Sequence, residues 1–117
     1  MTKSHAKWID EATAHTPAGA CRSMDEVRAG IDQLDREIVA LLAGRAGYVR
    51  QAARIKRRRQ EIVDPARIED VVAKTKGVAE GLGLPPELVE SLYRLMIERF
   101  IELEKAEFNR LHGAPKG

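Results

Sequence analysis

Two cations stand in the sequence where the surrounding pattern calls for apolar residues. From Met24 to Leu41, apolar residues recur at steps of three or four, and the next step of four reaches Arg45. Lys56 lies further along and, at about 100° per residue, returns to within roughly 20° of the same helix face. A buried cation is costly unless it is neutralised, so we expect either protein carboxylates or an anionic ligand to meet this pair.

Two more charged residues fall on or beside apolar stripes. Glu104 follows Phe100 by four residues and Met96 by eight, so an acid is expected on the buried face of a helix. Arg67 lies in the first turn of another expected helix, next to its apolar line. Helix spacing alone leaves two interpretations of Arg67 open, a surface salt bridge and a ligand contact.

Composition narrows the classes of function. The single cysteine, Cys21, excludes an intrachain disulfide, and the three histidines show no ligand spacing, so we expect no metal cluster. No apolar run approaches the roughly 18 residues of a membrane span, and no signal-peptide pattern is present. We therefore expect a soluble, cytoplasmic protein with no membrane partner. A net charge of +2 is too small to argue for nucleic acid.

The stripe that contains Arg45 predicts one long helix over about 23–60. Ser23 is a suitable N-cap, and Asp25 and Glu26 in the first turn complement the helix dipole. At ~1.5 Å per residue this helix would be about 55 Å long, whereas a compact chain of this length has a radius of gyration of only ~13–14 Å. A partner chain is the simplest way to bury so long a stripe, and we expect self-association.

A run of cations marks the end of this helix. Because the helix dipole favours cations at a C-terminus, we expect Arg57, Arg58 and Arg59 to be solvated. A nucleic-acid binder would instead use one broad basic face, formed by Arg50, Arg54, Arg57 and Arg58. That alternative lacks stacking aromatics and a recognised motif, and it gives Arg45 no role, so we expect no nucleic-acid partner.

Two breaks divide the rest of the chain into a short and a long helix. Asp64 is a suitable N-cap with Pro65 at the first helical position, which predicts a helix over about 65–81. The glycines after residue 80 and the Pro85-Pro86 pair end it, and a third helix is expected over about 86–111.

The predicted fold is all-α, with three helices that are long, short and long. No stretch alternates with period two, and no repeat or low-complexity block is present. Three such helices need a partner to close their core. The expected domain spans 23–112, with a mostly irregular tail at 1–22 and a short tail at 113–117.

The odd polar residues and the pattern around them resemble a known family. The pattern V-R-x-x-I-D-x-L-D-x-x-I-V-x-L-L-x-x-R at 27–45 is similar to the opening helix of the all-helical chorismate mutase family. The pattern Y-V-x-x-A-A-R-x-K at 48–56 is especially similar to the isochorismate pyruvate-lyase branch of that family, which serves salicylate biosynthesis. The resemblance covers about 23–112.

This resemblance implies an intertwined homodimer with two equivalent sites for a small dicarboxylate. It implies that Arg28 is donated to the partner's site. The spacing agrees, because Arg28 and Arg45 would lie roughly 100° apart around the helix and should not serve one pocket in cis. By the same resemblance, Arg45 and Arg67 hold the substrate carboxylates. Lys56 reaches one carboxylate and the bridging ether oxygen, and Glu104 takes the place of the second donor to that oxygen.

These residue types suit the reaction that the resemblance implies. Chorismate carries two carboxylates and an enol-pyruvyl ether, and its rearrangement to prephenate is pericyclic and needs no nucleophile, metal or cofactor. A protein can hold the side chain folded over the ring, for which the arginine fork is suited. It can also stabilise charge on the ether oxygen, for which a lysine is suited. The lack of a catalytic Ser, Cys or His constellation is what such a reaction predicts.

Glu104 departs from the family pattern, because glutamine is common at the matching position. An ionised carboxylate would oppose the negative charge that develops on the ether oxygen, whereas a protonated carboxyl group can donate a hydrogen bond to it. We therefore expect activity that improves toward mildly acidic pH, and we expect Glu104→Gln to flatten this dependence.

Three other positions bear on the choice between chorismate and isochorismate. Asp64 stands where chorismate mutases commonly have an acid near the ring hydroxyl. Ile68 replaces a hydroxyl-binding glutamate found in several mutases, and Phe100 replaces a small polar residue, so both resemble the lyase. We favour mutase activity, with the lyase reaction as the main or an additional activity. A structural dimerisation module is a further alternative, in which Arg45 and Glu104 would be interior residues paired with protein charges.

Overall fold

The structure, a computed structural model, describes residues 18–113 and is all-helical within that range. A short 3₁₀ turn, η1 (Ala18–Ala20), precedes the long helix α2 (Met24–Ile55). A second 3₁₀ turn, η2 (Arg59–Glu61), leads to α3 (Pro65–Leu82) and α4 (Pro86–His112). The three expected helices are confirmed. The tail expected at 1–22 lies mostly outside the described residues, as does the tail from residue 114.

The chain falls into two compact units, Met1–Arg45 and Ala46–Gly117, and each is described by itself. The described part of the first unit holds η1 and most of α2. The second unit holds the last turns of α2, then η2, α3 and α4. No helix within residues 18–113 is long and apolar enough to cross a membrane. The cytoplasmic location expected from the sequence stays a prediction.

The start of α2 follows its capping residues. The Ser23 hydroxyl accepts a hydrogen bond from the Glu26 backbone N–H at 3.2 Å. The Glu26 carboxylate in turn accepts one from the Arg22 backbone N–H at 2.6 Å. The bond to Ser23 satisfies a backbone donor that the first turn of a helix leaves unpaired. Ser23 is therefore the N-cap that the sequence predicts.

The end of α2 differs from the prediction, because the helix stops at Ile55 and does not continue to residue 60. The Lys56 N–H still donates to the Ala52 carbonyl at 2.9 Å, but the backbone at Arg58 is extended. Ile62 explains the early end. It is 4% exposed and packs with Ala53 in a core cluster, so the chain has to turn back to bury it. Burial of this side chain outweighs the helix propensity of the basic run.

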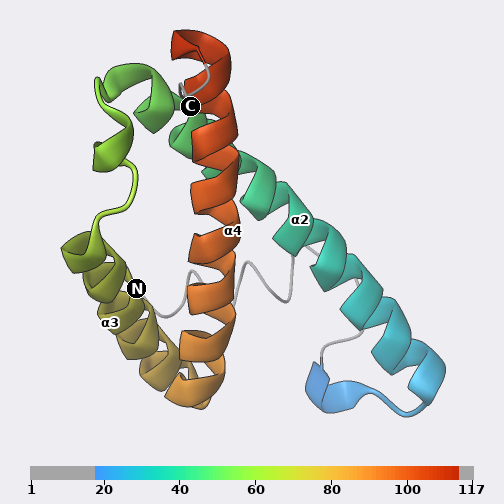
Figure 1. Ribbon diagram of the computed structural model, residues 1–117. Helices are drawn as coiled ribbons and strands as arrows, with labels where there is room; N and C mark the ends of the chain where they lie inside the picture. Colours follow the sequence, from blue (N-terminus) through green and yellow to red (C-terminus); the bar gives the residue numbers. More distant parts are fainter. Residues whose placement is uncertain (1–17, 114–117) are drawn as a thin grey trace. The chain divides into compact units, whose positions relative to one another are not determined.

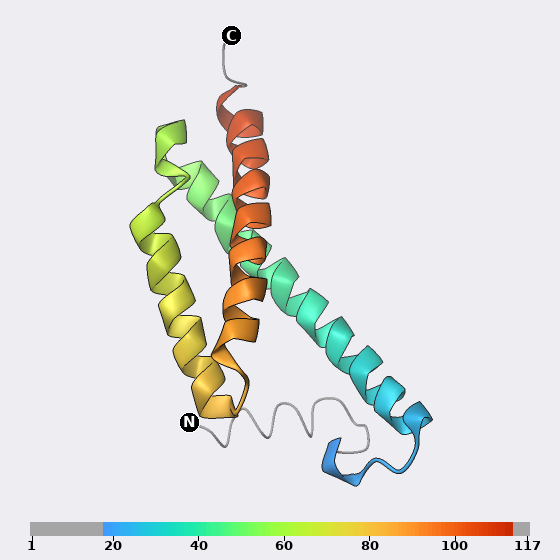
Figure 2. The same cartoon turned by 60° about the horizontal axis from the view of Figure 1, so that its bottom comes forward.

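The second unit is built around an antiparallel pair of helices, α3 and α4, which lie side by side in both Figure 1 and Figure 2. Asp64 caps α3 by accepting the Arg67 N–H at 3.1 Å, and Pro65 opens the helix. Gly83 ends it with a left-handed φ of 78°, a conformation that glycine adopts without a Cβ penalty. The predicted and observed ends of α3 and α4 differ by one residue.

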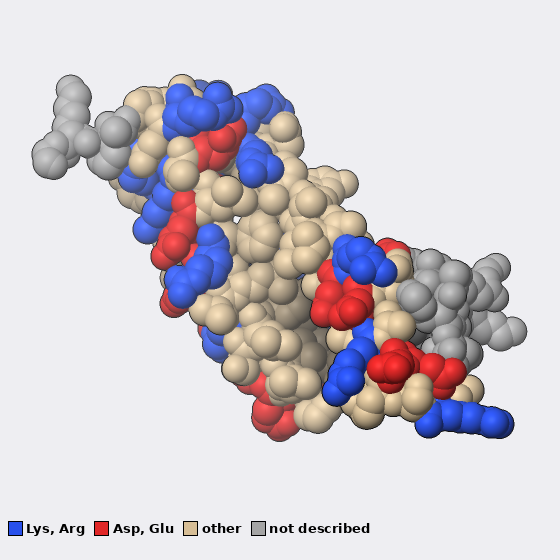
Figure 3. Space-filling model, turned by 90° about the vertical axis from the view of Figure 1, so that its right-hand side faces the viewer, with Lys and Arg blue, Asp and Glu red and all other residues tan. Residues whose placement is uncertain are grey.

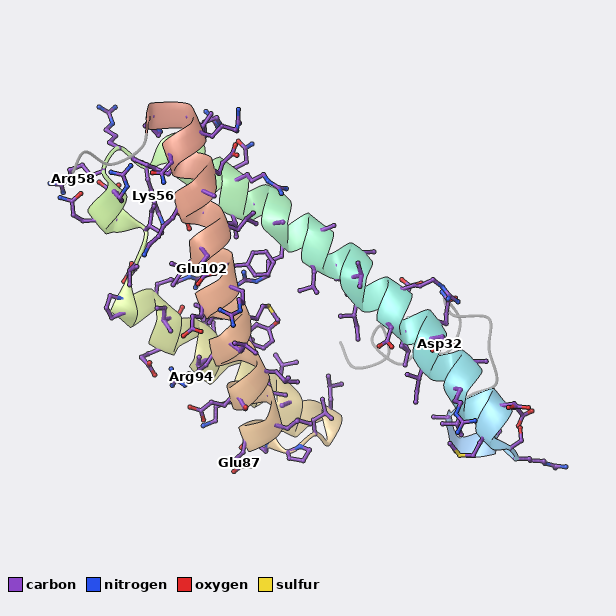
Figure 4. The ribbon with its side chains drawn as sticks, turned by 45° about the vertical axis from the view of Figure 1, so that its right-hand side comes forward. Asp32, Lys56, Arg58, Glu87, Arg94 and Glu102 are labelled. Carbon is purple, nitrogen blue, oxygen red and sulfur yellow. The ribbon has the colours of Figure 1, made fainter. Side chains whose placement is uncertain are left out.

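Charged residues join α3 to α4 along their length. Arg94 on α4 donates from two nitrogens to the two oxygens of Glu69 on α3, each at 2.9 Å (Figure 4). Glu90 accepts from Arg94 at 2.9 Å and pairs with Lys76 on α3, also at 2.9 Å. A bidentate arginine within a network of charges has better geometry than an isolated surface pair. This network links the two helices through cross-helix ion pairs.

Large apolar side chains remain exposed on all three α-helices. On α2, Ile31 is 51% exposed, Leu41 is 61% exposed and Tyr48 is 82% exposed, and Leu92 on α4 is 57% exposed. Figure 3 shows uncharged residues at the surface between groups of charged side chains. Exposed apolar patches of this kind mark interaction surfaces. The homodimer expected from the sequence stays a prediction.

Candidate active site

Lys56 and Glu104 are brought together as an ion pair. Lys56 directly follows α2, Glu104 lies on α4, and the Lys56 Nζ is 2.8 Å from a Glu104 carboxylate oxygen. Glu104 is 7% exposed, and within residues 18–113 it is the one charged residue that is buried. The Lys56 side chain is 27% exposed. Figure 4 shows Lys56 beside α4, on the connector between α2 and α3 (residues 56–64).

The sequence of α4 explains the burial of Glu104. Ile97, Ile101, Glu104 and Phe108 follow one another at steps of four, three and four, which places them on one helix face. Ile97 and Phe108 are buried, and Ile101 packs against the core cluster of Ala53, Ile62 and Phe108. An acid on this face loses its hydration, so it needs a partner. Lys56 is that partner.

The pair leaves Lys56 able to bind a further anion. A lysine ammonium has three N–H donors, and Glu104 accepts one of them. The remaining donors lie at a partly exposed position, next to the buried carboxylate. The geometry thus offers an oriented cation that is hydrogen-bonded to a buried carboxyl group. Such a pair can stabilise a developing negative charge on an ether oxygen only if Glu104 does not oppose it.

The residues around the start of α3 have structural roles in the chain. One Asp64 oxygen serves as the helix cap. The Arg67 guanidinium pairs with Asp70 at 2.8 Å, and its side chain is 63% exposed. For Arg67 the structure thus shows the surface salt bridge, one of the two interpretations that helix spacing left open. Ile68 and Phe100 are both partly buried. That these four residues contact a substrate stays a prediction.

Arg28 and Arg45 belong to the other compact unit. Arg28 is exposed on α2, and Arg45 is partly buried there. The structure therefore brings together Lys56 and Glu104, and a shared site with either arginine stays a prediction.

Sequence reasoning missed Arg59, which was expected to be solvated. One terminal nitrogen of its guanidinium donates to the Asn109 side chain at 2.5 Å and to the Gly113 carbonyl at 3.1 Å. The guanidinium carbon also lies 5.2 Å from the centre of the Phe108 ring, a cation–π distance. Arg58, by contrast, is exposed as expected. No signal in the basic run separates these arginines, because their difference depends on where α2 ends.

A pocket of about 610 Å³ lies beside the connector and does not include the Lys56–Glu104 pair. It is open to solvent and is lined by Arg59, Gln60, Val63, Lys105 and Asn109. Within residues 18–113, no group of three or more acidic, cysteine or histidine side chains is placed to hold a metal ion.

Comparison with known proteins agrees with the resemblance in the sequence. Residues 27–105 match the family described as chorismate mutase type II. An isochorismate pyruvate lyase from Pseudomonas aeruginosa is 30% identical over 94 residues, which cover 80% of this chain and 93% of that protein. Lys56 and Glu104 both lie within the residues that match the family. This chain therefore belongs to the chorismate mutase type II family.

Proposed function

We propose that this protein is a chorismate mutase that rearranges chorismate to prephenate. The observation that carries the proposal is the buried Glu104 held 2.8 Å from Lys56. The ammonium of Lys56, and Glu104 when it carries a proton, can each donate a hydrogen bond to the oxygen of the breaking ether bond. Family membership supports the reaction class.

Each residue has a role in the proposed mechanism. Arg45 and Arg67 bind the two carboxylates of the substrate and hold its side chain folded over the ring, which lowers the entropic barrier. Lys56 donates to a carboxylate and to the ether oxygen as the C–O bond breaks. Glu104, when protonated, donates a second hydrogen bond to the same oxygen. Asp64 lies near the ring hydroxyl.

The proposed active form is an intertwined homodimer. Exposed apolar side chains along α2, such as Ile38 at 50%, give a second copy a surface to cover. In such a dimer, the N-terminal half of each α2 helix would deliver Arg28 to the partner's site. Each site would then be incomplete without the other chain.

The test is incubation of the purified protein with chorismate and with isochorismate in separate reactions. We expect prephenate from chorismate, and we expect Lys56→Ala to lower kcat/KM by about 100-fold or more, since one oxyanion donor is typically worth 10²–10³-fold. Lys105→Ala is the matched control, because it removes an exposed lysine from α4. Absence of turnover of both substrates by the wild-type dimer would reject the proposal.

An isochorismate pyruvate-lyase activity is the second candidate. The 30% identical relative carries that name, and Ile68 and Phe100 resemble the lyase. In the lyase reaction, negative charge develops on the same ether oxygen, so the same cations would stabilise it. Salicylate and pyruvate formed from isochorismate faster than prephenate from chorismate would favour the lyase as the main activity. The non-enzymatic alternatives gain no support from the family match.

A further inference from the structure

Arg59 attaches the connector that carries Lys56 to the C-terminal end of α4. Its guanidinium donates to Asn109 and to the Gly113 carbonyl and lies over the Phe108 ring. The Gly113 carbonyl stands at the C-terminal end of α4, where helix carbonyls carry partial negative charge and favour a cation. Arg59 therefore binds one end of α4 through three different contacts.

These contacts lie one helical turn from the Lys56–Glu104 pair. Glu104 and Phe108 are four residues apart and share the buried face of α4. Lys56 and Arg59 are three residues apart on the connector. The connector thus meets two successive turns of the same helix face, first through Lys56 and then through Arg59. A shift of the second contact along α4 would move the first.

The connector has one more attachment, through Ile62. This side chain packs with Ala53 and Phe108, and its N–H donates to the Arg59 carbonyl at 3.1 Å. Burial of an apolar side chain holds the chain near the core but does not direct it, because apolar contacts have no preferred orientation. The two hydrogen bonds from Arg59 supply that direction.

The chemistry of Arg59 argues against a role in packing alone. Its Nε is buried and has no hydrogen-bond partner, and an unpaired buried donor is destabilising. An unbranched apolar residue such as methionine would fill this space without that penalty. Arginine is useful here because its terminal nitrogen reaches Asn109 and Gly113 together.

We propose that Arg59 is a positioning residue, which holds the connector on α4 so that the Lys56 ammonium points at Glu104 and the ether oxygen of the substrate. This inference rests on the proposed function. Arg59 acts through Lys56 and needs no contact with the substrate.

The first test compares Arg59→Met with Arg58→Ala. Both variants remove one positive charge from the same segment, but Arg58 is exposed and pairs only weakly, at 3.5 Å, with Glu61 on the connector itself. Figure 4 shows Arg58 on the outer side of the turn. A misplaced catalytic group affects the rate of the chemical step more than it affects the affinity for the substrate. We therefore expect Arg59→Met to lower kcat about tenfold with little change in KM. Arg58→Ala should behave as wild type.

A second pair of variants separates positioning from stability. Arg59→Lys keeps one charged donor and should recover part of the lost kcat. In a Lys56→Ala background, Arg59→Met should cause no further loss of kcat, because its target is already absent. An additional tenfold loss in that background would show that Arg59 acts independently of Lys56. If Arg59→Met folds poorly, Asn109→Ala serves as the substitute test. It removes the acceptor, leaves Arg59 in place and should cause the same loss of kcat.

A measurement without substrate keeps this inference apart from the proposed function. The rate at which acetic anhydride acylates Lys56, followed by mass spectrometry, reports how firmly its ammonium is held by Glu104. We expect this rate to rise at least threefold in Arg59→Met and to stay unchanged in Arg58→Ala. If wild-type protein turns over neither substrate, the proposed function fails, and the acylation rates alone decide on Arg59. Equal acylation rates in wild type and Arg59→Met would overturn the positioning role.

Discussion

At the scale of single residues, the Lys56–Glu104 pair is the part of the structure on which the proposed mechanism depends most. The buried carboxylate satisfies the cation, and the cation makes burial of the acid tolerable. The same contact sets a problem for catalysis, because an ionised Glu104 next to the ether oxygen would oppose the charge that develops there. In the proposed mechanism, Glu104 helps the reaction only when its carboxyl group carries a proton.

Replacement of Glu104 by glutamine tests this dependence on protonation. We expect kcat/KM of the wild type to rise toward mildly acidic pH, because only a protonated carboxyl group donates to the ether oxygen. Glu104→Gln supplies a permanent donor and should flatten the profile, with the largest gain at neutral and alkaline pH. The measurement is kcat/KM for chorismate across this pH range.

Glu102→Gln is the control for that profile. Glu102 lies on the same helix, its side chain is 67% exposed, and it pairs with Arg99 at 3.6 Å. It should keep the wild-type pH dependence. Identical profiles for wild type and Glu104→Gln would remove Glu104 from the mechanism.

Sequence reasoning at this scale succeeded where a residue broke a pattern. Glu104 lies on an apolar stripe, and its burial follows from its position on α4. Arg67 shows the limit, because helix spacing fixes the direction of a side chain but not its partner, and the structure pairs it with Asp70. Arg59 was missed because the helix was expected to continue through it, and only the turn at Arg58 brings it to α4.

At the scale of helices, the charged network between α3 and α4 makes a pH-dependent contribution to stability. The hydrogen bond from Arg94 holds the pKa of Glu69 below its ordinary value of 4.5. Lys76 first, and then Arg94, does the same to the pKa of Glu90. A carboxylate with a lowered folded-state pKa stabilises the protein above its unfolded pKa, and this contribution is lost as the pH falls through the folded pKa.

We therefore expect Arg94→Ala to lower the melting temperature by a few degrees at neutral pH and to weaken its fall below about pH 4.5. Thermal unfolding followed by circular dichroism at several pH values measures both effects. Arg99→Ala is the control, because its ion pairs to Glu98 and Glu102 are 3.6 Å or longer and stay within α4. An equal change in both variants would show that the cross-helix network contributes nothing of its own.

Two glycines at the C-terminal end of α3 should respond in opposite ways to substitution by alanine, one losing and one gaining stability. A Cβ added at Gly81 or Gly83 would meet no atom within 4 Å, so only backbone conformation decides the outcome. Gly83→Ala should destabilise by about 1–2 kcal/mol, because its φ of 78° is left-handed. Gly81→Ala lies within α3 and should stabilise by about 0.5–1 kcal/mol. Urea unfolding measures both, and a stabilising Gly83→Ala would contradict the assigned turn.

The ends of the helices were predictable where local chemistry sets them. Asp64 and Pro65 predict the start of α3, and the hydrogen bond that Asp64 accepts from the Arg67 N–H confirms the cap. The end of α2 was not predictable in this way. A run of arginine and glutamine favours helix, and the burial of Ile62 against Phe108 depends on a residue far along the chain.

At the scale of the whole molecule, the proposed homodimer makes a quantitative prediction about mixed chains. If Arg28 serves the partner's site and Lys56 its own, Arg28→Ala and Lys56→Ala chains together form one intact site in each heterodimer. Unfolding and refolding the two inactive variants in equal amounts should therefore restore about a quarter of the wild-type activity. The measurement is prephenate formation before and after mixing.

The control for this mixture uses two variants that damage the same site. Lys56→Ala mixed with Arg67→Ala should restore nothing, because the proposed mechanism takes both residues of a site from the same chain. Recovery in this control, or none in the first mixture, would contradict the donation of Arg28. The sequence predicted that a partner chain buries the apolar stripe of α2, but the periodicity of one chain carries no record of which surface covers that stripe.

The connector between α2 and α3 combines several tasks in very few residues. Lys56 carries the charge, Arg59 holds α4, Ile62 fills the core and Asp64 starts the next helix. An insertion or deletion here would disturb all four together, so this segment has little room to vary in length. Substrate preference in such a fold can then change through single substitutions on the helix faces, where one side chain can be replaced without moving the others.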